Sequence, residues 1–155
     1  MPTSEDQLTA KGIARVLSET HGLGDEAMIF RLVRHLTAQR LLDTVGAVNT
    51  GSGRSRHYNA AALVDAAVLL RLHRLGGTVG QMREVVSALK RSLRNDFKTT
   101  NIVAACEGME RPTLFIFVPD DRHTRFIARL KEWSTAAATL LDHRDVLVIQ
   151  LNRFL

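Results

Sequence analysis

The sequence is poor in the residues that build disulfides and metal centres. Its single cysteine, Cys106, cannot form an internal disulfide and cannot supply a zinc site alone. The histidines are scattered, and no two stand at the spacing of ligands on one helix or loop. They are His21, His35, His57, His73, His123 and His143. We therefore predict neither a metal nor another cofactor.

Long apolar runs are also missing. The longest ones, such as Leu114–Val118, are far shorter than the ~20 residues of a membrane-spanning helix. Residues 1–7 are polar and acidic, unlike the basic start and apolar centre of a signal peptide. With 45% hydrophobic and 24% charged residues, the composition is that of a folded soluble protein. We expect a cytoplasmic protein with no membrane partner.

The charge is distributed unevenly along the 155 residues. Residues 1–100 hold 14 Lys and Arg against 9 Asp and Glu, whereas residues 101–155 hold 7 of each. A basic excess confined to one segment suits a phosphate-binding surface, because each neutralised phosphate releases counterions. The alternative is a basic face that is merely solvated.

The first forty residues have the pattern of two helices joined by a glycine turn. Thr9 is a good N-cap for a first helix, which Gly22 and Gly24 end. Asp25 caps a second helix that runs to about Arg40. Its apolar residues recur at helical spacing and form one face. These residues are Ile29, Leu32, Val33 and Leu36.

A short hairpin and two more helices follow. Residues 44–48 are expected to pair with residues 55–58 across a glycine-rich tip, which makes a β-wing. Asn59 caps a third helix that ends near Leu75, before two glycines. Thr78 then begins a fourth helix that continues into the basic residues 90–94.

The C-terminal part has a β-rich pattern. We predict a linker or short helix over 95–112, a strand over 113–118, a helix from about 121 to 141 and a strand over 146–151. Two apolar strands around a helix indicate a small βαβ unit. Since so small a unit makes a poor independent core, we expect residues 113–155 to pair with a second copy in a homodimer.

The predicted fold class is therefore α+β. A winged helix-turn-helix with four helices and a β-wing occupies residues 1–94, residues 95–112 form the linker or short helix, and a βαβ-like segment occupies 113–155.

The candidate function comes from basic residues on the second helix and the wing. Arg31, Arg34 and His35 face away from the apolar side of the helix, as a recognition helix requires. Arginine at a hairpin can enter a minor groove or grip phosphates, and a tyrosine hydroxyl can donate to a phosphate. For Tyr58 the other interpretation, which is compatible with the first, is that its ring packs under the wing and over the third helix. The predicted DNA-binding residues are Lys11, Arg31, Arg34, His35, Arg54, Arg56, His57 and Tyr58.

Three segments carry a resemblance to a known family: Val33–Leu36 with Leu41-Leu42, Gly53–Tyr58 and residues 72–82. They resemble the MerR family of winged-helix bacterial transcription regulators. Val33–Leu36 leading to Leu41-Leu42 is similar to its recognition helix, and Gly53–Tyr58 to its wing. Residues 72–82 are similar to its leucine-glycine break between the third and fourth helices. The resemblance covers about residues 8–90. It implies a sequence-selective regulator that binds double-stranded DNA, with RNA polymerase or another protein as a further candidate partner.

This chain departs from the family pattern at several positions. His35 and Leu36 stand where aromatic residues are usual, and Arg40 replaces a glycine. Family members usually dimerise through a long coiled-coil helix, whereas Gly108, Pro112 and the β-rich run here argue against a long uninterrupted helix. The family's base preference therefore does not transfer to this chain.

Two other classes of function are alternatives. Asp120, Asp121 and His123 can be drawn as an acid–base group, but they equally suit a turn that begins a helix. No nucleophile, phosphate loop or metal set accompanies them, so we predict that the protein is not an enzyme. The other alternative is a winged-helix adaptor that binds a regulator through the neutral C-terminal part, including Trp133.

Overall fold

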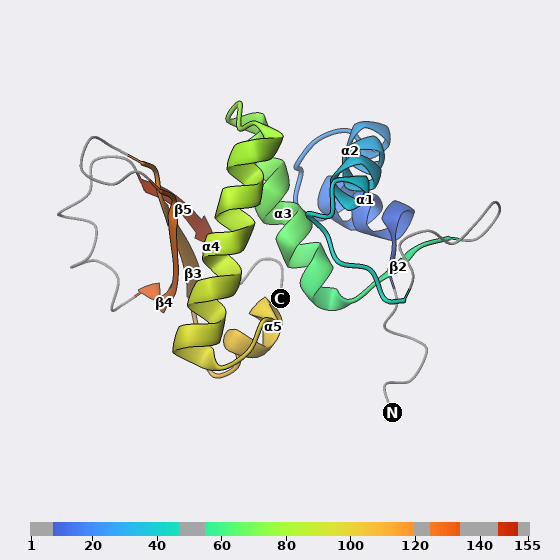
Figure 1. The fold of residues 1–155 in the computed structure, drawn as a ribbon. Coiled ribbons are helices and arrows are strands. Elements are labelled where there is room, and N and C mark those ends of the chain that lie inside the picture. Colours follow the sequence, from blue (N-terminus) through green and yellow to red (C-terminus); the bar gives the residue numbers. More distant parts are fainter. Residues whose placement is uncertain (1–7, 47–54, 120–124, 134–145, 152–155) are drawn as a thin grey trace. The chain divides into compact units, whose positions relative to one another are not determined.

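A computed structural model describes residues 8–46, 55–119, 125–133 and 146–151 of the chain. The described residues form five helices and two small antiparallel sheets, an α+β fold (Figure 1). The chain divides into two compact units, Met1–Val79 and Gly80–Leu155. This division lies before the boundary expected at residue 94, so almost all of the fourth helix belongs to the second unit.

The first unit contains the expected three helices. They are α1 (Ala10–Glu19), α2 (Glu26–Ala38) and α3 (Ala60–Arg74). Each begins after a side chain that accepts a backbone N–H of the first turn, which is otherwise without a partner. Thr9 accepts from Gly12 at 3.1 Å, and Asp25 accepts from Met28 at 3.0 Å. Asn59 accepts from Ala62 at 3.0 Å. The three predicted N-caps are confirmed.

The core of the first unit comes from one face each of α1 and α2, and from most of α3. In α1 and α2 the buried residues recur at helical spacing, whereas α3 is apolar almost all round. The buried apolar residues are Ile13, Ala14 and Leu17 of α1, Ile29, Val33 and Leu36 of α2, and Ala61, Ala62, Val64 and Ala66–Leu70 of α3.

A small β ladder accompanies these helices. Strand β1 (Leu8–Thr9) pairs antiparallel with β2 (His57–Tyr58). On the other side of β2, Val45 bridges to His57, with a 2.8 Å bond from its N–H to the His57 carbonyl. The pairing expected between residues 44–48 and 55–58 is thus present at this bridge, while the tip at 47–54 lies outside the described residues. The strand at Leu8 was not predicted.

Helix α2 ends in a Schellman motif. The N–H of Arg40 bonds the Thr37 carbonyl, and the N–H of Leu41 bonds the Leu36 carbonyl, both at 2.9 Å. The backbone at Arg40 is left-handed, with φ of 58°. The motif turns the chain so that Leu41 and Leu42 are buried.

The second unit joins two helices to a three-stranded sheet. The helices are α4 (Val79–Phe97), which begins one residue before the unit, and α5 (Ile102–Ala105). The strands are β3 (Pro112–Phe117), β4 (Ile127–Glu132) and β5 (Val146–Gln150). The sheet order is β4-β3-β5, and both neighbours of β3 run antiparallel to it.

The C-terminal topology corrects two predictions. The expected helix over 121–141 is wrong at residues 127–132, which form an edge strand hydrogen-bonded to β3. Residues 121–124 and 134–141 of that prediction lie outside the described residues. The βαβ unit is wrong as well, since its two strands would be parallel, whereas β3 and β5 are antiparallel neighbours. The predicted strands themselves are confirmed within one residue at each end.

Strand β3 is buried on both faces. Leu114 and Ile116 point to one side, and Phe115 and Phe117 point to the other, as the two-residue period of a strand requires. Trp133 stacks on Phe115, with the ring centroids 6.4 Å apart. Among the described residues, no helix is long and apolar enough to span a membrane.

Candidate nucleic-acid interface

The outer face of α2 is basic and exposed. Arg31, Arg34 and His35 are all exposed, as predicted. On the opposite side of the helix, Val33 and Leu36 are only 2% and 1% exposed. The apolar side therefore holds the helix on the unit, and the basic side remains in solvent.

The two arginines of this face are not neutralised by neighbouring carboxylates. Neither Arg31 nor Arg34 forms an ion pair with any described residue. The only acidic residue of α2 is Glu26, at its first position. Arg34 places its guanidinium carbon 5.7 Å from the ring centroid of Phe30, a cation–π contact that leaves the N–H donors available.

Tyr58 is buried, which conflicts with its predicted contact with a DNA phosphate. Its side chain is fully buried, and its hydroxyl lies 2.8 Å from Oγ1 of Thr37. Thr37 already donates its own proton to the Val33 carbonyl at 2.8 Å, so Tyr58 must donate to Thr37. The predicted contact between this hydroxyl and a DNA phosphate is therefore wrong, and the alternative of a packed ring is confirmed.

This buried hydrogen bond fixes β2 to α2. Because side chains alternate along a strand, the burial of Tyr58 leaves the adjacent His57 exposed. His57 pairs through its backbone with Thr9, the N-cap of α1, and with Val45. The structure thus brings His57, the start of α1 and the second half of α2 together around Tyr58.

Of the two predicted arginines of the wing, only Arg56 lies within the described residues. Arg56 is half-buried and interacts within the protein. Arg54 lies outside the described residues, as do Asp120, Asp121 and His123 of the acid–base alternative.

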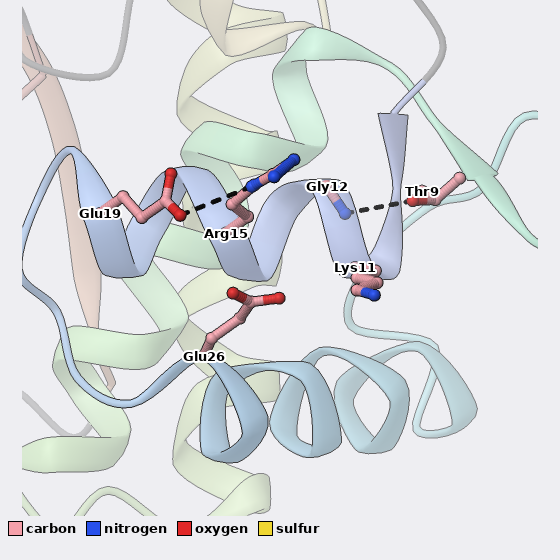
Figure 2. Close-up of a pocket in the computed structure, with 6 residues that line it drawn as sticks. All are labelled: Thr9, Lys11, Gly12, Arg15, Glu19 and Glu26. Atoms are coloured by element: carbon pink, nitrogen blue, oxygen red, sulfur yellow. Dashed lines mark hydrogen bonds and ion pairs between the residues drawn. The ribbon is translucent and has the colours of Figure 1, made fainter.

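Lys11 lines a surface hollow of about 460 Å³ between α1 and α2. Its other lining residues are Thr9, Gly12, Arg15, Glu19 and Glu26. Figure 2 shows Glu26 reaching from the first turn of α2 toward α1, on the side where Lys11 extends. Arg15 pairs with Glu19, with 3.5 Å between Nε and Oε1. Lys11 is exposed as predicted, in a hollow whose lining also holds Arg15 and the carboxylates of Glu19 and Glu26.

Sequence reasoning missed two residues that shape this surface. Thr37 lies on the buried side of α2, four residues after Val33, and that spacing was a usable signal. Arg40 has a left-handed backbone at the end of α2, and the available signal was the glycine that the MerR pattern has at this position.

Comparisons with protein-family models, with curated proteins and with solved structures find no match to this chain.

Proposed function

We propose that the protein is a transcription regulator that binds double-stranded DNA sequence-selectively, and that its first unit is a MerR-like winged helix-turn-helix. One observation carries the proposal: α2 exposes Arg31, Arg34 and His35 without described carboxylate partners, while its opposite face is buried. A helix that enters a major groove needs this division between a docking side and a reading side.

The parts of the first unit have distinct roles in this proposal. Helix α2 lies in the major groove, where the guanidinium groups of Arg31 and Arg34 reach guanine edges or phosphates. His57, with Arg56 and Arg54, contacts the flanking backbone, and Lys11 adds a phosphate contact. Tyr58 contributes indirectly, because its bond to Thr37 holds His57 in place relative to α2.

The test is a fluorescence-anisotropy titration of the full chain with a labelled duplex at two salt concentrations. Affinity must fall steeply as salt rises, because phosphate contacts release counterions. Arg34→Ala should weaken binding by about 1–3 kcal/mol without lowering the thermal stability. Arg129→Ala is the matched control, since it removes an exposed arginine from β4 of the second unit.

Three outcomes would overturn the proposal. Binding that does not depend on salt, or no binding to duplex, would favour the adaptor, which contacts another regulator instead of DNA. Equal losses in Arg34→Ala and Arg129→Ala would show that only net charge matters. If none of these outcomes is found, mapping of the DNA bound across a genome would identify the sequence that the protein recognises.

A further inference from the structure

Two described non-glycine residues have a left-handed backbone, and both are basic. Arg40 has φ of 58° and follows α2, whereas Lys98 has φ of 57° and follows α4. Both side chains are exposed. A Cβ makes this conformation unfavourable, and glycine is its usual occupant. Each position therefore keeps a side chain at a cost in stability.

For Lys98 the structure shows what the side chain does. Its Nζ donates to the Asn95 carbonyl at 3.0 Å, one of the last carbonyls of α4. A lysine that hydrogen-bonds the end of its own helix stabilises that end directly. Lys98 thus has a local structural role that offsets the strained backbone.

Arg40 has no such role. The hydrogen bonds of its Schellman motif come from the N–H groups of Arg40 and Leu41, and a glycine at position 40 would preserve them. The guanidinium of Arg40 contacts no partner among the described residues. A general attraction between a cation and the end of a helix remains, but it is weak at an exposed site and screened by salt.

The position of Arg40 suggests a partner outside the protein. Helix α2 has 13 residues, which is about 20 Å, whereas a major groove is about 12 Å wide. The ends of a helix that crosses the groove therefore lie near the phosphates on its walls. Arg40 lies at one of these ends, about 9 Å along the helix axis from Arg34.

We infer that Arg40 binds a phosphate of the DNA backbone through its guanidinium group. The inference rests on the proposed function, because it needs a duplex against α2. A guanidinium fork matches two phosphate oxygens with two parallel N–H donors, which a lysine cannot reproduce. The left-handed backbone at Arg40 then lowers the stability of the protein, while its guanidinium group adds a charged contact to DNA at the end of the recognition helix.

Three variants of the full chain test the inference. Arg40→Gly removes both the guanidinium and the strain, Arg40→Lys keeps the charge, and Lys98→Gly makes the matching change at the other left-handed position. Each is titrated against a labelled mixed-sequence duplex of about 30 base pairs, since phosphate contacts do not depend on sequence. Thermal unfolding of each variant is measured in parallel.

We expect Arg40→Gly to bind about five- to tenfold more weakly and to lower the slope of log K against log salt by about one unit. Its Tm should rise by about 2 °C, because the strain is relieved. Arg40→Lys should lose part of the affinity, and Lys98→Gly should bind like the wild type.

Other results would overturn the inference. If the wild type binds and Arg40→Gly binds equally well, Arg40 is not a contact, although the proposed function stands. If the wild type does not bind duplex, the inference and the proposed function fail together. A Tm that falls in Arg40→Gly would show that the arginine stabilises the end of α2 and is not kept there for DNA.

Discussion

At the residue scale, the bond between Tyr58 and Thr37 is the feature that connects fold and proposed function. It is buried, and a single chain of donors runs from the Tyr58 hydroxyl through Thr37 to the Val33 carbonyl. A hydrogen bond of this kind contributes little net free energy, but it specifies one arrangement of the two elements that it joins.

We predict that Tyr58→Phe lowers the free energy of unfolding by about 1 kcal/mol, since one buried hydrogen bond is lost while the ring stays packed. Urea denaturation followed by circular dichroism measures the change. Thr37→Val is the partner variant in a double-mutant cycle. If the two losses simply add, the two hydroxyls do not interact, and the bond is not what fixes β2 to α2.

Cys106 gives a prediction about pH. The thiol is buried, and burial raises its pKa to about 11, from an ordinary value of 9.0. Well below pH 9 the thiol is protonated in both folded and unfolded chains. Between pH 9 and 11 only the unfolded chain releases the proton, which favours unfolding.

We therefore expect the wild type to lose stability from pH 9 to 11 more steeply than Cys106→Ala. Chemical denaturation at pH 8, 9 and 10.5 checks this difference. Parallel curves for the two proteins would mean that the folded-state thiol titrates as a solvated one does.

At the element scale, Gly77 lies just after α3 and packs closely against the backbone of the last turn of that helix. The Gly77 N–H bonds the Leu72 carbonyl at 2.9 Å. A Cβ added at Gly77 would stand 2.9 Å from that same carbonyl oxygen, closer than such atoms approach. We predict that Gly77→Ala costs about 1–3 kcal/mol, because the end of the helix must shift.

Gly12 is the control for this prediction. It lies inside α1, and a Cβ there would meet only ordinary contacts, the nearest at 3.5 Å. Gly12→Ala should raise stability by about 0.5–1 kcal/mol, since alanine is the better helix former. Thermal unfolding of both variants should show shifts of opposite sign, and shifts of the same sign would contradict the argument.

The sequence was sufficient for elements whose ends carry their own signals. Thr9, Asp25 and Asn59 each begin a helix because their side chains satisfy N–H groups of the next turn, and this chemistry is local. The exposed face of α2 followed equally well, because helical periodicity separates Arg31 and Arg34 from Val33.

Strand β4 was missed because the intrinsic preference of its residues is for a helix. Ala128, Arg129, Leu130 and Lys131 are all good helix formers. They form a strand because backbone pairing with β3 and the burial of Ala128 and Leu130 outweigh that preference. The alternation of these two apolar residues with Arg129 and Lys131 was the signal available.

The sequence predicted the candidate site only on α2, where helical periodicity shows which side chains are exposed. The burial of Tyr58 depends on a contact with Thr37, 21 residues away, and no local pattern encodes it. The role proposed for Arg40 depends on its φ angle, which the arginine itself does not indicate; only the glycine of the similar family pattern at this position points to it.

At the scale of the whole molecule, we propose that the chain forms the homodimer expected from its sequence. The sheet leaves one side of β4 and one side of β5 unpaired among the described residues, and unpaired strand edges favour association. We predict a particle of twice the 17.2 kDa chain mass in light scattering at micromolar concentration. A monomer under those conditions would contradict the homodimer and leave the proposed function untouched.

The division into two units gives this chain a natural optical label in each. Its one tyrosine, Tyr58, is buried in the first unit, and its one tryptophan, Trp133, stacks on Phe115 in the second. Emission from the two rings can thus report separately on each unit in the unmodified protein. Melting curves that coincide would mean that the units unfold as one cooperative block, and curves that separate would give each unit its own stability.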